Sequence, residues 1–355
     1  MILKLIFLVC CMSFFCRSQA QQISLFDEET VLDITLSGDL DKLFKDRVGE
    51  ATYLNLHLRY RDERGELVEI PIKSKTRGNF RRRKNVCTYP PLLLNFSKST
   101  SSNSIFHQQD KVKLVMPCKM DKYVIREYYA YKLFNLISEK SFKVRLVRIT
   151  LEDSSGKMKQ EGPFYAFLIE EEEQLAKRNG IEVLKKDFLR PELVIKEDFL
   201  AMAVFQYLIG NTDWSVQYRQ NIKLFSDQYQ ENIVAVPYDF DHAGIVSAPY
   251  AKPAEALKLS SVLERRYRGY CIQDMEKFEH VFTIFNERKD DIYELYTGSP
   301  YLEKSYINST LKYLNAFYRT INSPRLAKVE FTYPCDPEGT GHVVIKGLRE
   351  IEDQD

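Results

Sequence analysis

The chain has 355 residues, and its 51 basic residues nearly balance its 50 acidic ones. A formal net charge of +1 gives no global attraction to nucleic acid or to an anionic membrane, so no nucleic-acid partner is expected. The abundance of tyrosine and phenylalanine, 22 of each, and the scarcity of glycine and proline exclude a largely disordered chain.

The first 20 residues have the pattern of a secretory signal peptide. Lys4 supplies a positive charge, an apolar run covers 5–15, and Ser18 and Ala20 are the small residues that a cleavage site requires. The run is shorter than the roughly 20 apolar residues that cross a bilayer, so no integral membrane span is expected. Acylation of Cys16 is the alternative, which the bulky residues before it disfavour. We therefore expect an exported protein, periplasmic or extracellular.

Residues 21–173 are expected to form one mixed, strand-rich lobe. Alternation of apolar and polar residues predicts strands, and a broad apolar face predicts a helix. The order is hairpin, helix, hairpin, with a flexible Ser/Asn-rich connection at 97–104. The expected strands lie at 33–36, 53–58, 67–72, 92–96, 113–116, 144–151 and 162–169, and the helix lies at 122–138.

Residues 174–327 are expected to form a mainly helical lobe, which makes the fold class α+β. The amphipathic pattern predicts helices at 198–209, 275–296 and 304–322, and two short strands at 221–225 and 232–237. The C-terminal tail, 328–355, is expected to return as a strand pair between 328 and 348.

Four cysteines remain outside the leader, at positions 87, 118, 271 and 335. An even number in an exported chain permits two disulfides. Their isolated spacing contains no CxxC pair, which disfavours a zinc site. We expect Cys87 to bridge Cys118, because both flank strands of the same lobe. Buried free thiols are the alternative that the sequence leaves open.

Chemically meaningful residues are densest between positions 210 and 244. A loop carries Asp213, Asn221 opens one predicted strand, and Asp239 and Asp241 follow the next. Folding that hairpin brings Asn221 and Asp239 to the same end, facing the loop of Asp213. Asn and Asp oxygens suit Mg²⁺, and phosphoryl transfer needs one carboxylate to orient the acceptor and others to hold the metal. The alternative is an ordinary helix C-cap and two capping carboxylates.

The order of motifs resembles the CotH-like (spore-coat kinase) family of atypical protein kinases, and in particular its secreted bacterial members. The resemblance covers residues 50–250. Its motifs are Lys-Thr-Arg-Gly-Asn at 75–79 with the basic run after it, Arg-Glu at 126–127, the strand 164–171 that enters an acidic segment, Gly-Asn-Thr-Asp-Trp at 210–214 and Pro-Tyr-Asp-Phe-Asp at 237–241.

This resemblance implies a two-lobed atypical-kinase fold, with ATP as substrate and Mg²⁺ or Mn²⁺ as cofactor. It implies that Asp213 is the catalytic-loop aspartate and that Asn221 and Asp239 hold the metal, with Asp241 as a further metal ligand. Glu127 matches the helix glutamate that pairs with a nucleotide-contacting lysine.

The same resemblance implies that the acidic segment beginning at Glu170 is the hinge that meets adenine. The phosphate-contacting lysine is not obvious, which leaves Lys113, Lys75 or Lys73. Arg77, followed by Gly78, is expected to replace a glycine-rich loop over the phosphates.

Two further features of the sequence bear on the expected kinase-like site. Asn221 lies eight positions after Asp213, a longer gap than in the H-R-D-x-x-x-x-N pattern of ordinary kinases, so either the residues between them bulge or the metal-binding asparagine is not Asn221. The basic run 77–84 is either a phosphate clamp or a solvated surface loop.

The expected function is phosphate transfer from ATP-Mg to a protein or a small hydroxyl acceptor outside the cytoplasm. The alternative is an inactive pseudokinase or ligand-binding module of the cell envelope. A metal-dependent hydrolase built on Asp239 and Asp241 lacks the additional ligands that such sites use.

Overall fold

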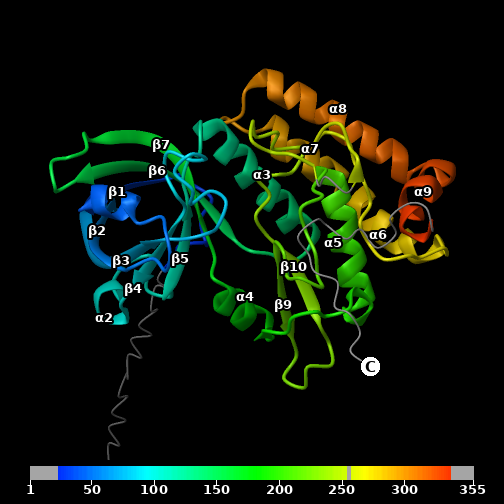
Figure 1. Ribbon diagram of the computed structural model, residues 1–355, viewed down its shortest axis with the longest axis horizontal. Helices are drawn as coiled ribbons and strands as arrows, with labels where there is room; N and C mark the ends of the chain where they lie inside the picture. The colour runs from blue at the N-terminus through cyan, green and yellow to red at the C-terminus, as the bar shows by residue number, and fades with distance from the viewer. Residues whose placement is uncertain (1–22, 254–256, 337–355) are drawn as a thin grey trace, which may run out of the picture.

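The computed structural model describes residues 23–253 and 257–336. The expected signal peptide and the tail beyond residue 336 lie outside the described residues. Strands dominate the N-terminal part and helices the C-terminal part (Figure 1). This mixture of a strand-rich and a mainly helical region was expected, whereas the division into two kinase lobes stays a prediction. None of the described helices is long and apolar enough to cross a membrane.

Seven strands of the N-terminal part close into a barrel, which the expected hairpin-helix-hairpin order did not predict. All neighbouring strands are antiparallel except β1 and β6, which pair in parallel and close the barrel. In barrel order the strands are β1 (Leu32–Gly38), β2 (Leu54–Arg61), β3 (Leu67–Thr76), β4 (Leu92–Phe96), β5 (Lys111–Val115), β7 (Glu161–Ile169) and β6 (Val144–Asp153).

The barrel interior is filled by the alternate apolar residues of its strands. In β2, for example, Leu56, Leu58 and Tyr60 are buried while the residues between them are more exposed. Two short helices, α1 (Leu40–Lys45) and α2 (Lys98–Ser101), complete this region. Helix α2 occupies part of the segment 97–104 that was expected to be a flexible connection, and the hydroxyls of Ser101 and Ser104 bond to the backbone carbonyls of Ser97 and Ser101.

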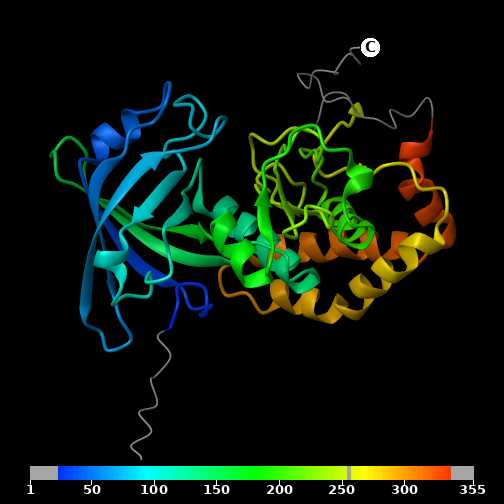
Figure 2. The same cartoon turned by 90° about the horizontal axis from the view of Figure 1, so that it is seen from below.

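The remaining elements form the helical part and a small sheet in the strand order β10-β9-β8. Figure 2 shows this part beside the barrel from a second direction. In chain order the elements are α3 (Asp121–Ile137), α4 (Glu172–Asn179), β8 (Glu182–Leu184), η1 (Pro191–Leu193), α5 (Lys196–Ile209), β9 (Ile222–Ser226), β10 (Val234–Pro237), α6 (Glu276–Glu287), α7 (Lys289–Thr297), α8 (Lys304–Ile321), α9 (Pro324–Phe331) and η3 (Tyr333–Cys335).

Two expected elements differ from the structure. The single helix 275–296 is interrupted at Arg288, because α6 packs on α5 while α7 turns to contact α3 and α8. The expected strand pair after residue 328 is wrong in its described part, which is the end of α9 and then η3. Ser323 caps α9 and Pro324 occupies its first turn, a combination that starts helices.

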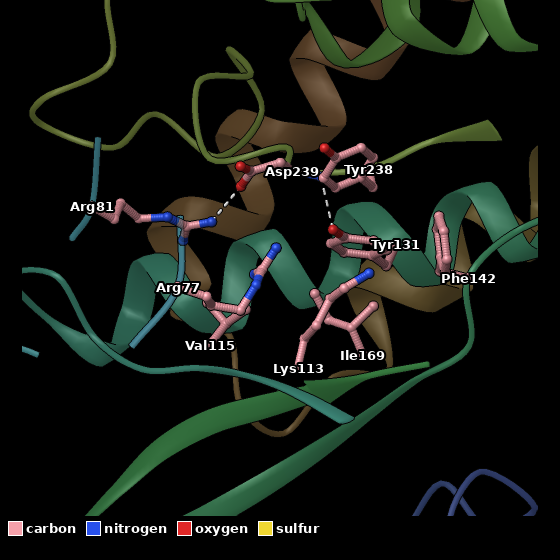
Figure 3. A pocket seen from close by; sticks show the side chains of 9 residues that line it. All are labelled: Arg77, Arg81, Lys113, Val115, Tyr131, Phe142, Ile169, Tyr238 and Asp239. Atoms are coloured by element: carbon pink, nitrogen blue, oxygen red, sulfur yellow. Dashed lines mark hydrogen bonds and ion pairs between the residues drawn. The ribbon is translucent and has the colours of Figure 1, made fainter. Parts of the chain in front are cut away.

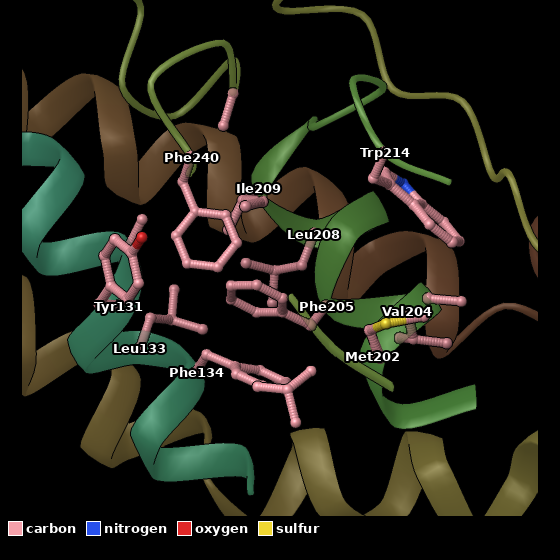
Figure 4. Close-up of a cluster of buried hydrophobic side chains, with 14 of the residues drawn as sticks. Tyr131, Leu133, Phe134, Met202, Val204, Phe205, Leu208, Ile209, Trp214 and Phe240 are labelled. Atoms are coloured by element: carbon pink, nitrogen blue, oxygen red, sulfur yellow. The ribbon is translucent and has the colours of Figure 1, made fainter. Parts of the chain in front are cut away.

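A second hydrophobic cluster joins α3 to α5 and to the residues after β10 (Figure 4). The ring of Phe134 lies 4.5 Å from that of Phe205, and the ring of Tyr131 lies 4.6 Å from that of Phe240, measured between centroids. Phe240 is fully buried and stands between two aspartates. Its burial therefore fixes the backbone from which Asp239 and Asp241 project.

Two disulfides cross-link the described part of the chain. The expected bridge between Cys87 and Cys118 is confirmed, and a second one joins Cys271 to Cys335. The first bridge ties the loop after β3 to the segment between β5 and α3.

Replacing Cys87 and Cys118 together by serine is expected to lower the free energy of unfolding by about 2–4 kcal/mol. The bridge closes a loop of sequence separation 31, so its loss gives the unfolded chain more conformational freedom. Urea denaturation of the double variant measures the effect, and removing both thiols avoids a free cysteine. An unchanged transition midpoint would contradict the prediction.

Candidate functional site

A small pocket lies between the barrel and the segment that follows β10 (Figure 3). Three of its lining residues are cations and one is a carboxylate, and the rest are apolar or aromatic. The lining residues are Arg77, Arg81, Lys113, Val115, Tyr131, Phe142, Ile169, Tyr238 and Asp239.

Lys113 reaches this pocket because of the alternation along β5. Val112 and Leu114 belong to the barrel interior, so Lys113 projects from the other face of the strand. Its side chain is buried, with the ammonium nitrogen 5.2 Å from the ring centroid of Phe142. Burial, and after it the positive charge of Arg77, lowers the pKa of Lys113 to about 8.

Arg81 is buried at the centre of a cluster of three carboxylates, of which Glu127 and Asp241 are also buried. Its guanidinium makes two bonds to Glu127 on α3, at 2.8 and 3.2 Å, and Nη2 also bonds to Oδ1 of Asp239. Its Nε lies 3.3 Å from Oδ2 of Asp241. The Arg81 side chain is only 8% exposed, whereas that of Asp239 is 37% exposed. Asp239 is therefore the carboxylate of the cluster that is most open to a ligand.

The ionisation of the cluster reflects both burial and Arg81. Burial raises the pKa of Glu127 to about 8 even though Arg81 favours the charged form. Burial also raises the pKa of Asp241, and the neighbouring Asp239 adds to this. For Asp239 the effect of burial is outweighed by the charges of Arg81 and Arg77, which lower its pKa. Asp239 is thus held as an anion at neutral pH.

The loop that carries Arg81 is anchored on both of its sides. The exposed ring of Phe80 lies 5.5 Å from the ring of His242 and 5.9 Å from that of Tyr250, which follow the aspartates in the chain. Arg82 donates from Nε to the Thr76 hydroxyl at 3.0 Å. The position of Arg81 is thus set by contacts to both parts of the molecule.

Asp213 and Asn221 lie together, beside the end of the β9–β10 hairpin. Helix α5 ends at Gly210, whose φ of +67° gives the left-handed C-cap from which the loop departs. Nδ2 of Asn221 donates to the backbone carbonyl of Asp213 at 2.7 Å and to its Oδ2 at 3.0 Å. The Tyr238 amide donates to the Asn221 carbonyl at 3.0 Å, which puts Asn221 at the same end of the hairpin as Asp239.

The long gap between Asp213 and Asn221 forms the expected bulge. Two backbone hydrogen bonds between Ser215 and Gln220, of 2.9 and 3.0 Å, close a small loop, and Arg219 within it has a φ of +48°. The side-chain amide of Gln220 then donates to Oδ1 of Asp213. The extra residues therefore supply a second donor to the aspartate.

Arg268 supports the loop from the other side. It donates to the carbonyls of Thr212 and Trp214, the residues on either side of Asp213, and the second of these bonds is 2.9 Å long. Trp214 is buried and packs near Phe199. The side chain of Arg268 is therefore turned inward, toward the loop of Asp213.

Other expected residues lie away from the pocket. The ammonium of Lys75, on β3, stands 4.8 Å from the ring centroid of Tyr53, and neither Lys75 nor Lys73 lines the pocket. The Glu170 side chain is buried, bonds to Nε of Arg178 at 2.9 Å and accepts from the Lys143 amide at 3.0 Å. Ile169, the residue before the expected hinge segment, lines the pocket instead.

No known family model and no curated protein matches this chain. Among solved structures the chain is similar to the crystal structure of a Helicobacter pylori proinflammatory kinase, CtkA, with a TM-score of 0.40 and 12% sequence identity. The match covers 67% of this chain and 93% of that one.

Arg81 is the residue of the site that the sequence did not single out. A solvated loop was one reading of the basic run, and for Arg81 it is wrong, because the side chain is buried among carboxylates. No local pattern separates Arg81 from Arg82 or Arg83. The available signal was charge balance: carboxylates such as Glu127 and Asp241 are buried only with a compensating cation nearby.

The donors present suit a hard divalent cation. Asp239, Asp241 and Asn221 offer only oxygen ligands, which Mg²⁺ and Mn²⁺ prefer. Within residues 23–253 and 257–336, no group of three or more His, Cys, Asp or Glu is placed to hold a metal ion. The absence of such a group agrees with the geometry of the cluster, because the Arg81 guanidinium lies among the carboxylates.

Proposed function

We propose that this protein is an exported kinase-like phosphotransferase, which moves the terminal phosphate of ATP to a hydroxyl of a protein or small molecule. The observation that carries the proposal is the convergence of Lys113, Arg77 and Arg81 with Asp239 in one pocket. Three cations suit a polyphosphate, and the carboxylate suits its metal ion. The order of sequence motifs that resembles the CotH-like family supports the same function.

Each residue has a role in this scheme. Lys113 and Arg77 contact phosphate oxygens, and the apolar wall formed by Ile169 and Phe142 accommodates the base. Asp239 and Asn221, with Asp241, hold Mg²⁺ or Mn²⁺, which neutralises charge on the phosphates.

Asp213 orients the acceptor hydroxyl and receives its proton. The acceptor oxygen forms a bond to the terminal phosphorus while the bond from that phosphorus to the bridging oxygen breaks, and ADP leaves with that oxygen. Gln220 and Asn221 keep the Asp213 carboxylate fixed for this step.

The location of the protein is part of the proposal. The leader at 1–20 favours export, and the two disulfides support an oxidising compartment, either the periplasm or the extracellular space. The identity of the acceptor is left at the level of a hydroxyl compound.

Titration calorimetry with ATP, with and without Mg²⁺ or Mn²⁺, tests the proposal. We expect metal-dependent nucleotide binding in the wild type and a loss of at least about tenfold in Asp239→Asn, because the variant removes one charged ligand. Glu63→Gln, an exposed acid in the β2–β3 turn, is the matched control. Failure of the wild type to bind nucleotide at all would refute the proposal.

A second candidate function is nucleotide or anion binding without turnover, as in a pseudokinase. The contacts of Arg81 with all three carboxylates favour it, because they occupy groups that catalysis needs. Nucleotide binding without phosphate transfer to any acceptor, water included, would distinguish this function from the first.

A further inference from the structure

The contacts of Arg81 are of two kinds. Toward α3 the guanidinium makes a two-bond contact with both oxygens of Glu127, the geometry in which arginine holds a carboxylate most firmly. Toward the loop after β10 it makes one contact to Asp239 and one to Asp241. Glu127 thus anchors the guanidinium, while the two aspartates are its exchangeable partners.

Those exchangeable partners are the residues that the proposed function gives to the metal ion. A divalent cation at Asp239 would lie beside the guanidinium, and two positive charges at one carboxylate repel each other. The buried Phe240 lies between the two aspartates in the chain, and both aspartates already contact Arg81. Arg81 and the metal therefore compete for Asp239.

The pocket offers Arg81 another anion when it leaves Asp239. Arg81 lines the same pocket as Lys113 and Arg77, where the proposed function places the phosphates (Figure 3). The loop itself is anchored by Phe80 and Arg82, and the Glu127 contact can persist, so the change is confined to one side chain. A buried N–H that loses its acceptor needs a new one, and a phosphate oxygen supplies it.

We propose that Arg81 is a substrate-binding residue, which exchanges Asp239 for a nucleotide phosphate when the divalent cation binds. This inference rests on the proposed function. It gives Arg81 opposite effects on two ligands: it opposes binding of the metal alone and favours binding of the metal–nucleotide complex.

Calorimetric titration of the protein without its expected leader, first with MnCl₂ alone and then with ATP in excess Mn²⁺, tests this exchange. In Arg81→Gln we expect Mn²⁺ alone to bind about tenfold more tightly and ATP–Mn to bind about tenfold or more weakly than in the wild type. Arg83→Gln is the matched control, since it removes an exposed charge of the same loop, and it should leave both affinities within about twofold of the wild type.

Opposite shifts support the exchange, and parallel shifts overturn it. Weakening of both affinities would make Arg81 a structural residue, and tightening of both would make it only an obstacle to the metal. Should Arg81→Gln not fold, Arg81→Lys keeps the charge without the two-bond contact, and the same opposite shifts are expected at smaller size. Absence of ATP–Mn binding in the wild type would instead refute the proposed function, and the exchange with it.

Discussion

Asp213→Asn is expected to slow phosphate transfer by about 10²–10⁴-fold, the usual contribution of a residue that takes a proton in the transition state. Both carboxylate oxygens of Asp213 accept hydrogen bonds, one from Gln220 and one from Asn221. An amide in their place turns an NH₂ group against one of these donors and removes the proton acceptor. Initial rates of ADP release at saturating ATP-Mg measure the effect.

Nucleotide affinity separates this role from a general loss of structure. Asp213 is outside the pocket that Lys113 and Asp239 line, so ATP-Mg should bind to Asp213→Asn nearly as it does to the wild type. Asp187→Asn is the control, because it removes an exposed carboxylate that pairs with Arg219 in the neighbouring bulge. An Asp213→Asn variant that turns over at the wild-type rate would exclude Asp213 from the reaction.

Lys113→Met is expected to abolish metal-dependent ATP binding and, at pH 7, to stabilise the fold by up to about 3 kcal/mol. Burial lowers the pKa of Lys113 from 10.5 to about 8, so the folded protein holds the charged form at a cost that the unfolded chain does not carry. Methionine fills a similar volume without a charge. The protein thus gives up stability to keep a cation in the pocket.

The stabilisation of the fold by Lys113→Met is expected to depend on pH. Between pH 8 and 10.5 the folded state has lost the Lys113 proton and the unfolded state still holds it, so the free energy of unfolding rises with pH across this window. Below pH 8 both states are protonated and the full cost is present. The difference between the urea-denaturation curves of wild type and Lys113→Met should therefore shrink from pH 7.5 to pH 10. A difference that is constant with pH would show that Lys113 titrates normally.

Local patterns in the sequence predicted the elements better than their assembly. Strands such as β2 and helix α8 carry their periodicity in their own residues, and the β9–β10 hairpin follows from two adjacent apolar runs. The parallel pairing of β1 with β6 joins residues more than one hundred positions apart, and no local pattern records it. Helix α4 is short and mostly polar, and strand β8 has only three residues, so neither carries a periodic signal.

The residues of the candidate site also differ in whether local sequence patterns predicted them. Asp213, Asn221 and Asp239 were expected together because a hairpin brings the residues at its open end into proximity, and the structure places Asn221 beside both the Asp213 loop and that end. Arg81 enters the site through the fold of a long loop, between positions 77 and 91, which meets α3 only in three dimensions. Its contacts with Glu127 and Asp239 span 46 and 158 positions of sequence, and sequence periodicity carries no information over such separations.

The parallel pairing of β1 and β6 also governs the order in which this chain can fold. Strand β1 finds its antiparallel neighbour β2 soon after both have been synthesised, but its other edge stays open until β6 has emerged. Pairing of strands this distant in sequence is a slow event that requires closure of a long loop. Until then β1 offers an unpaired edge to other chains, so crowding of newly made chains should favour aggregation before closure. Completion of the barrel also requires β5 to pair with β7, which sets Lys113 beside Ile169, so the pocket that these two residues line is a late product of folding.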